Sequence, residues 1–116
     1  EYEKALADID RVIEARPHWA LAYNNRGDIW REKGEYDKAL ADFDQAVELD
    51  VRYAEAFANR GKTWRAKGEL AKSLADYRTA LTLVPALIEA HKRGCEREPA
   101  SQEWRKAAFE LEQLVK

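Results

Sequence analysis

The chain has 116 residues, a length that suits one domain. Charged residues make up 36% of it, but a net charge of -2 gives no electrostatic reason to expect nucleic acid or an anionic membrane as a partner. No apolar stretch approaches the roughly 18 residues that a membrane-spanning helix needs.

We find no signal peptide, and the absence of methionine leads us to expect a fragment or a processed product of a longer chain. The single cysteine cannot form an internal disulfide. Nothing therefore demands an oxidising compartment, and a cytoplasmic location is favoured.

The first predicted helix runs from Glu1 to Arg16. Its apolar residues recur at spacings of three and four, which places them on one face, and Pro17 ends it. A second helix is predicted over 20–33, with Gly34 as its stop. Gly27 lies in the middle of this helix, where glycine costs about 1 kcal/mol relative to alanine. We therefore expect a neighbouring helix to approach closely at Gly27.

The next three helices are predicted over 36–49, 54–67 and 70–83. The helix over 54–67 repeats the pattern of the helix over 20–33 at a spacing of 34 residues, and the helix over 70–83 repeats that over 36–49 in the same way. A fixed period of this length is typical of repeat architectures. Because the connections are short, neighbouring helices are expected to be antiparallel.

The end of the chain continues this register in a weaker form. A further copy of the helices over 36–49 and 70–83 is predicted from Ser101 to Val115. The helix before it, at about Leu87 to Arg97, departs from the pattern of the helices over 20–33 and 54–67. An atypical terminal repeat is expected of a cap. The predicted organisation is a single domain made of half a repeat over 1–19, repeats over 20–53 and 54–87, and a degenerate capping repeat over 88–116.

The two complete copies resemble the tetratricopeptide repeat, a 34-residue helix–turn–helix unit. The matching residues are Tyr23, Arg26, Gly27, Trp30, Ala39 and Phe43 in one copy, and Phe57, Arg60, Gly61, Trp64, Ser73, Tyr77 and Pro85 in the next. The resemblance implies an all-α, right-handed superhelical solenoid with seven helices. It also implies a protein–protein interaction scaffold that binds a peptide or partner segment in a concave groove, with no catalysis and no cofactor.

Arg26 and Arg60 stand where the pattern of the family has leucine. A charged group on a packed face needs water or a partner of opposite charge. We expect each arginine to pair with an aspartate of the preceding helix. The candidates are Asp8 or Asp10 for Arg26, and Asp42 or Asp44 for Arg60.

The resemblance further implies that the first helix of each repeat lines the groove. The candidate peptide-binding residues lie opposite the apolar face of these helices: Asn24, Asn25, Asp28, Arg31, Asn59, Lys62, Arg65, Lys92 and Arg93. Asparagine offers donors and acceptors to an extended peptide, and the cations gather toward the C-terminal half. This favours a protein or peptide partner with an acidic portion. The alternative is that these charges only form a solvated face.

A more specific possibility is the carboxylate-clamp type of this family, which binds the C-terminal tails of heat-shock chaperones. Asn59 and Arg93 match the residues that this type uses. Asn24, Asp28 and Glu89 do not match, and Glu89 reverses a charge. The clamp is therefore not the expected mode of binding.

Two other functions remain open. The first helix has no partner within its own repeat, so an apolar flank of Tyr2, Leu6, Ile9 and Ile13 could support self-association as a homodimer. His91 and Cys95 lie four residues apart on a predicted helix and could form a nucleophile–base pair. A closed metal site needs about four ligands, and no other histidine or cysteine is near, so we expect no metal and favour a packing role for both residues.

Overall fold

The structure is a computed structural model that describes residues 2–83 and 101–115. Within these ranges it holds six helices and no strand: α1 (Tyr2–Ala15), α2 (Ala20–Glu32), α3 (Tyr36–Leu49), α4 (Ala54–Ala66), α5 (Leu70–Thr82) and α7 (Ser101–Val115). The all-α class is confirmed. The additional helix predicted at about Leu87 to Arg97 lies outside the described residues. Among the described helices, none is long and apolar enough to cross a membrane.

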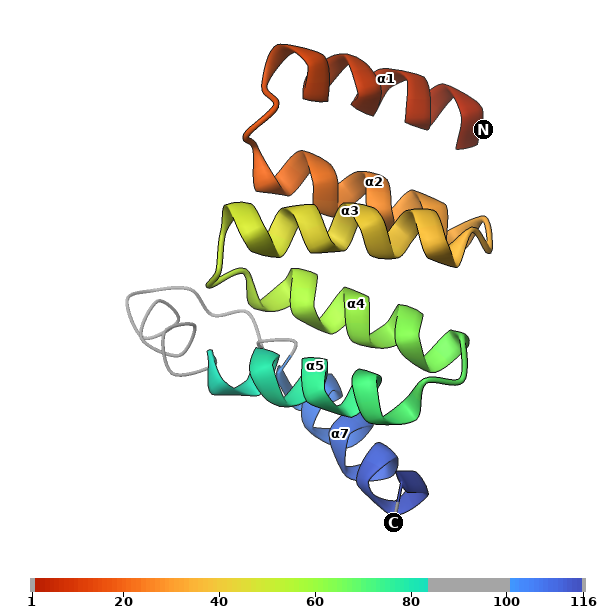
Figure 1. The fold of residues 1–116 in the computed structure, drawn as a ribbon, viewed down its shortest axis with the longest axis vertical. Helices are drawn as coiled ribbons and strands as arrows, with labels where there is room; N and C mark the ends of the chain where they lie inside the picture. Colours follow the sequence, from red (N-terminus) through yellow and green to blue (C-terminus); the bar gives the residue numbers. More distant parts are fainter. Residues whose placement is uncertain (1, 84–100, 116) are drawn as a thin grey trace.

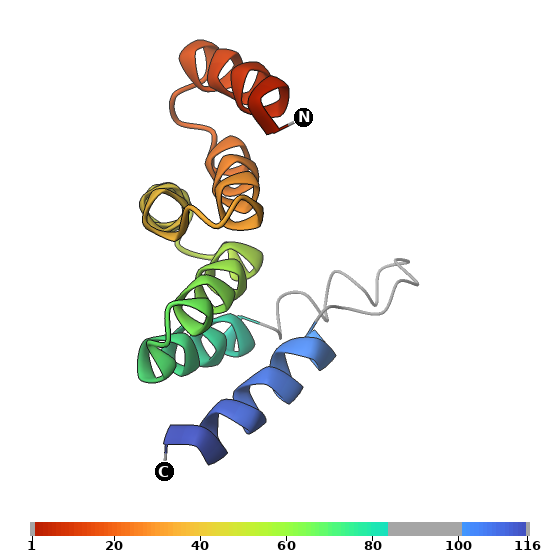
Figure 2. The same ribbon diagram turned by 90° about the vertical axis from the view of Figure 1, so that its right-hand side faces the viewer.

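The helices stack in chain order, with α1 at one end and α7 at the other (Figure 1). Within the repeats, α2 packs against α3 and α4 packs against α5; between repeats, α1 contacts α2 and α3 contacts α4. The first helices of successive repeats, α2 and α4, also contact each other. Figure 2 shows α2 and α3 side by side, with α3 on one side of the stack. This layered stacking of helix pairs is the architecture of a solenoid.

Glycine lets the two helices of each repeat approach closely. A Cβ atom on Gly27 would lie 2.7 Å from Cε1 of Phe43, and one on Gly61 would lie 3.1 Å from the ring of Tyr77. Both rings are buried. The close approach expected at Gly27 is therefore confirmed: an aromatic ring of the second helix fills the space that a side chain would take.

The first helix of each repeat ends as the glycine pattern predicts. Gly34 has a φ of 84°, in the left-handed region that favours glycine. Its N–H donates to the carbonyl of Arg31, and the N–H of Glu35 donates to the carbonyl of Trp30. These two bonds form a Schellman motif, which satisfies the last carbonyls of α2. Gly68 has the same conformation at the end of α4.

The C-terminal helix α7 packs against α5 and completes the core at that end. Trp104 and Leu111 of α7 are buried and join Leu74 and Tyr77 of α5 in one cluster. The helix predicted from Ser101 to Val115 is confirmed.

Candidate functional site

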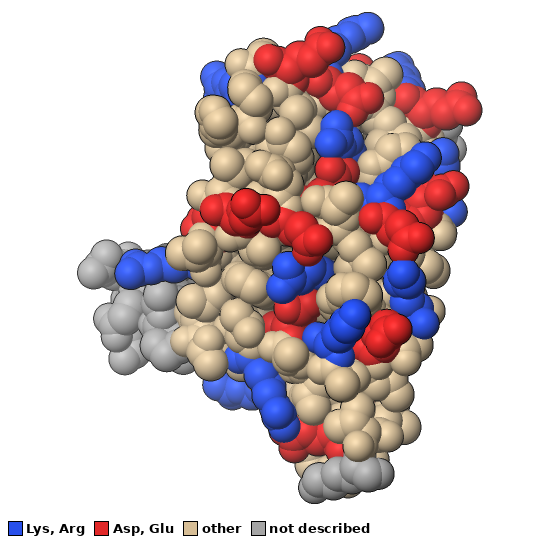
Figure 3. Space-filling view, in the orientation of Figure 1, with Lys and Arg blue, Asp and Glu red and all other residues tan. Residues whose placement is uncertain are grey.

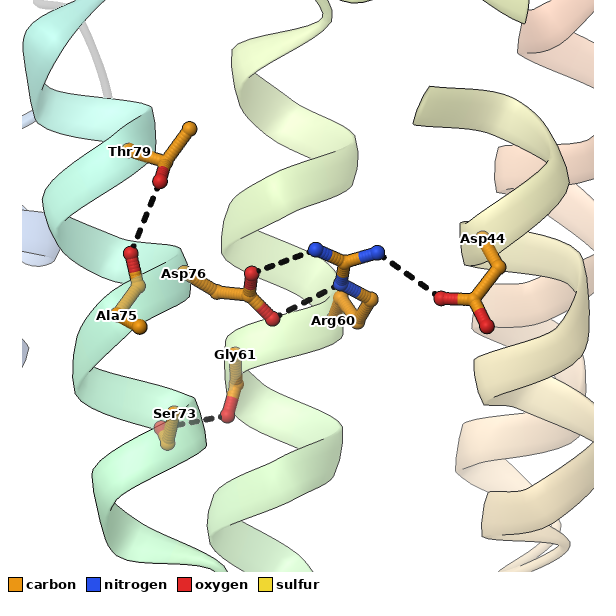
Figure 4. A network of polar contacts seen from close by, with 7 residues as sticks. All are labelled: Asp44, Arg60, Gly61, Ser73, Ala75, Asp76 and Thr79. Atoms are coloured by element: carbon orange, nitrogen blue, oxygen red, sulfur yellow. Dashed lines mark hydrogen bonds and ion pairs between the residues drawn. The ribbon is translucent and has the colours of Figure 1, made fainter. Parts of the chain in front are cut away.

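Arg60 on α4 connects three helices (Figure 4). Its Nε and Nη2 donate to both carboxylate oxygens of Asp76 on α5, at 2.9 and 2.8 Å, and its Nη1 donates to Asp44 on α3 at 2.9 Å. The side chain of Asp76 is 8% exposed and that of Asp44 is 59% exposed. The hydrogen bond with Asp76, more than that with Asp44, raises the pKa of the Arg60 guanidinium against the opposing effect of burial.

Arg26 on α2 makes the same contacts one repeat earlier. It donates to both oxygens of Asp42 on α3 at 2.8 and 2.7 Å, and to Asp10 on α1 at 2.9 Å. Of the alternatives expected from the sequence, the pairs Arg26–Asp10 and Arg60–Asp44 are confirmed. Asp42 binds Arg26 rather than Arg60, so that alternative is wrong.

The sequence analysis did not predict that each arginine binds both carboxylate oxygens of an aspartate in the following helix, Asp42 for Arg26 and Asp76 for Arg60. The spacing of the residues contains a signal for this contact. Each arginine lies 16 residues after one aspartate partner and 16 residues before the other. All three donor nitrogens of each guanidinium are thereby used. The two arginines stabilise the stack and are not candidates for binding a ligand.

Asn24 and Asn59 form a buried contact between α2 and α4. The amide Nδ2 of Asn59 donates to Oδ1 of Asn24 at 3.1 Å, and the two residues are 8% and 3% exposed. Burial raises the pKa of the neighbouring Tyr53, and its interaction with the side chain of Asn24 lowers that pKa. The expectation that both asparagines are open to a groove is therefore wrong, because the contact between α2 and α4 covers them and each amide finds its partner inside the protein.

Asn25 and Lys62 are exposed on the same two helices. Neither side chain forms a hydrogen bond or an ion pair with the residues that the structure describes. Leu21, one helical turn before Asn25, is also exposed. Of the predicted site residues that the structure describes, Asn25 and Lys62 are thus the exposed ones whose polar groups have no partner among the described residues.

Arg31 and Arg65 occupy equivalent positions near the ends of α2 and α4, and both have acidic partners. The guanidinium of Arg31 donates to Asp28 of the same helix at 2.5 and 3.2 Å. Arg65 donates to Glu110 of α7 at 3.4 Å, a long bond between two half-exposed groups. Arg65 is therefore held more loosely than Arg31.

The charges of Arg31 and Arg65 both affect the pKa of Tyr77. Burial is the main cause that raises the pKa of its hydroxyl. The positive charges of Arg65 and Arg31 lower this pKa, and Glu103 of α7 raises it. Side chains from α2, α4 and α7 thus contribute to the electrostatic environment of one phenol on α5.

The aromatic residues near the ends of the same helices are covered by cations. Lys38 lies 4.5 Å from the ring centroid of Trp30, and Lys72 lies 4.6 Å from that of Trp64. Both rings are half-buried. These contacts are of the cation–π kind, which stabilises the turn side of each repeat.

The remaining predicted residues cannot be placed. Lys92 and Arg93, and the pair His91 and Cys95, lie outside the described residues. Within the described residues, no group of three or more histidine, cysteine, aspartate or glutamate side chains is arranged to hold a metal ion. On the face that carries α3, basic and acidic side chains alternate without a region of a single sign (Figure 3).

Comparisons with known proteins agree with this geometry. The family model of the tetratricopeptide repeat matches residues 20–53. No curated protein sequence matches the chain. The second tetratricopeptide-repeat domain of Spaghetti (RPAP3), solved bound to the HSP90 peptide SRMEEVD, is 35% identical with a TM-score of 0.68, over 71% of this chain and 76% of that one.

Two further solved structures cover almost the whole chain. The second domain of human RPAP3, in complex with the HSP70 peptide SGPTIEEVD, is 28% identical with a TM-score of 0.76, over 96% of this chain and 81% of that one. The TPR2B domain of yeast Sti1 has the same fold, with 20% identity and a TM-score of 0.82, over 97% of this chain and 84% of that one. From the repeat pattern, the stacked helix pairs and the 35% identity to the Spaghetti domain, we conclude that this chain belongs to the tetratricopeptide-repeat family.

Proposed function

We propose that the chain is a protein-interaction module that binds an extended acidic peptide across α2 and α4. The observation that carries this proposal is the Spaghetti domain, which is 35% identical and is bound to the peptide SRMEEVD. The human RPAP3 domain, 28% identical, is bound to SGPTIEEVD. Both peptides carry two glutamates and an aspartate near their end, so an acidic segment is the partner class that the relatives share.

The side chains that would recognise such a segment are Asn25, Lys62 and Arg65. Asn25 offers donors and acceptors to a peptide backbone, and Lys62 offers an ammonium group that has no partner within residues 2–83 and 101–115. Arg65 can exchange its long bond with Glu110 for a bond to a peptide carboxylate at little cost, because exposed ion pairs contribute little. Asp28 is assigned a supporting role, since it holds Arg31 in place. Lys92 and Arg93, both outside the described residues, stay part of the proposed site.

We propose further that glutamate and aspartate side chains, rather than the terminal carboxylate, dominate this binding. A carboxylate clamp would use the amide of Asn59 as a donor. That amide is buried and already donates to Asn24. Binding a terminal carboxylate there would break a buried hydrogen bond, which costs about 1 kcal/mol or more.

Fluorescence anisotropy with labelled SRMEEVD tests the proposal. The free acid and the C-terminal amide are expected to bind with similar affinity. Replacing two cations in Lys62→Gln/Arg65→Gln should weaken binding about tenfold, because two exposed charge contacts together contribute roughly 1.4 kcal/mol.

The matched control is Arg105→Gln/Lys106→Gln. It removes the same two charges from exposed positions on α7 and should leave the affinity unchanged. Equal losses in the two double variants would show an effect of net charge and reject the site. A loss of binding on amidation would instead assign the terminal carboxylate as the recognised group.

We also propose that the module acts without catalysis. The alternative is an enzyme in which Cys95 is the nucleophile and His91 the base. For a binding module, the Cys95→Ala variant is expected to bind the peptide as the parent chain does. Self-association through the N-terminal helix finds no support in these comparisons, and sedimentation over a concentration series tests it. A cytoplasmic location stays part of the proposal on one ground, that the single cysteine demands no disulfide.

A further inference from the structure

Arg31 and Arg65 occupy equivalent positions in successive repeats but take their acidic partners from different helices. Arg31 binds Asp28, which lies three residues earlier in α2. The position equivalent to Asp28 in α4 is Lys62, so α4 offers Arg65 no carboxylate at this spacing. A second cation stands there instead, and residues three apart on a helix are neighbours, whose like charges repel. Lys62 and Arg65 therefore lack the local neutralisation that Asp28 gives to Arg31.

The carboxylate that Arg65 binds comes from the C-terminal helix. Nη1 of Arg65 donates to Oε1 of Glu110 on α7 at 3.4 Å, across 45 positions of sequence. The two side chains are 40% and 47% exposed. Lys62, on the same helix as Arg65, is exposed and has no partner in the part of the chain that the structure describes. Of the two neighbouring cations, the described residues thus neutralise one.

A second observation places an acidic side of α7 beside the same region. Glu103 lies seven residues, or two helical turns, before Glu110 and therefore shares its side of the helix. Burial raises the pKa of Tyr77 on α5, the charge of Arg65 lowers this pKa, and the charge of Glu103 raises it further. Glu103 and Arg65 thus act on the same phenol, which agrees with the direct contact between Arg65 and Glu110.

We propose that Glu110 mimics one carboxylate of an acidic partner and limits the affinity of the protein for such partners. This inference rests on the peptide site proposed above for α2 and α4. A peptide with two glutamates finds Lys62 without a partner, but it must displace Glu110 to reach Arg65. A peptide without glutamates has no carboxylate to exchange for Glu110 at this point. Glu110 therefore weakens the binding of acidic peptides and leaves the binding of neutral ones unchanged.

The size of the effect follows from the exposure of the contact. Ion pairs between exposed side chains contribute little, because water screens them. Glu110→Gln removes the competing charge and keeps the length of the side chain. This variant should bind labelled SRMEEVD about threefold more tightly than the parent chain in fluorescence anisotropy.

The matched control is Glu112→Gln. Glu112 also lies on α7 and also binds an arginine of another helix, Arg78 of α5, at 3.1 Å. Its side chain is 38% exposed, compared with 47% for Glu110. This variant removes the same charge from the same helix at a contact outside the proposed site, so the affinity for SRMEEVD should not change. Far-UV circular dichroism checks that both variants keep their helical content.

Two further measurements separate competition from other effects. The peptide SRMQQVD, in which glutamine replaces both glutamates, should bind the parent chain and Glu110→Gln equally well. In a chain that already carries Arg65→Gln, the additional change Glu110→Gln should no longer raise the affinity for SRMEEVD, because the bond for which the two carboxylates compete is absent.

Four results would overturn the proposal. An unchanged affinity of Glu110→Gln for SRMEEVD would show that Glu110 does not compete. Equal gains in Glu110→Gln and Glu112→Gln would show a general charge effect. A gain of the same size for SRMQQVD would show a change in the shape of the site. A gain that persists together with Arg65→Gln would show long-range repulsion in place of competition.

Failure of the peptide site itself has a different signature. In that case SRMEEVD does not bind the parent chain, or Lys62→Gln/Arg65→Gln leaves its affinity unchanged, and the role of Glu110 fails with the site. If the double variant weakens binding about tenfold and Glu110→Gln has no effect, the site stands and the competition by Glu110 alone is wrong.

Discussion

Double-mutant cycles on Arg60 should separate one strong bond from one weak bond of the same guanidinium. The Arg60–Asp76 contact has two hydrogen bonds and an aspartate whose side chain is 8% exposed. Water screens such a pair little, so we expect a coupling free energy of about 1.5–3 kcal/mol, the range of hydrogen bonds to charged groups. The Arg60–Asp44 contact has one hydrogen bond to a carboxylate that is 59% exposed, and its coupling should be about 0.2–1 kcal/mol.

The couplings follow from the free energy of unfolding in urea of the single and double alanine variants at Arg60, Asp76 and Asp44. Far-UV circular dichroism and tryptophan fluorescence should be recorded together, since a repeat array can unfold in steps and coincident curves justify a single free energy. In about 1 M salt, where the Debye length is about 3 Å, the Asp44 coupling should shrink more than the Asp76 coupling.

Arg26 supplies an internal replicate of this experiment. Its bond pair with Asp42 and its single bond with Asp10 have the same geometry and nearly the same exposures. The Asp42 coupling should exceed the Asp10 coupling by a similar amount. Equal couplings at both arginines, or a larger coupling with the exposed aspartate, would refute the argument that burial decides the strength of these bonds.

Three further predictions concern stability. Gly27→Ala should lower the free energy of unfolding by about 1–2 kcal/mol, because the clash with Phe43 outweighs the better helix propensity of alanine. Gly61→Ala should cost less, because the contacts of its added Cβ begin at 3.1 Å. Urea unfolding compares the two variants, and a larger loss at Gly61 would contradict the argument. Gly34→Ala should cost about 1–2 kcal/mol through left-handed backbone strain alone, visible as a lower Tm; an unchanged Tm would exclude that strain. Burial raises the pKa of Tyr77 above its ordinary 10.0, so the contribution of the neutral phenol to stability is complete below about pH 10 and is lost as the pH rises through the folded pKa. In urea unfolding, the Tyr77→Phe variant should therefore lose less stability than the parent chain between about pH 9 and 11. Identical pH profiles of the two proteins would contradict this prediction.

Most of the fold was predictable because its signals are local or periodic. A spacing of three and four places apolar residues on one helix face, and glycine at the end of a helix adopts a conformation that other residues avoid. The position of Gly27 required a close neighbour, and its repetition at Gly61 showed that the neighbour recurs with the period. The sequence also predicted that Arg26 and Arg60 pair with carboxylates, because a charge on a packed face must be compensated.

The candidate site was less predictable, as Asn24 and Asn59 show. Helical periodicity says which way a side chain points from its own axis, but not whether the next helix covers that direction. The contact between α2 and α4 covers both asparagines, while Asn25, one residue farther along the same helix, stays exposed. The difference comes from the packing of one repeat on the next, which the pattern within a single helix does not contain.

The sequence by itself determined the succession of helices, the 34-residue period, the glycines that permit close packing and the need of Arg26 and Arg60 for acidic partners. Only the tertiary structure decided which aspartates bind them, that Asn24 and Asn59 face each other, and that Asp8 has no partner among the described residues. The physical reason is the range of the interactions. Helix formation depends on residues within a few turns, whereas these contacts join side chains 16 or 35 residues apart, whose meeting depends on how the helices pack on one another.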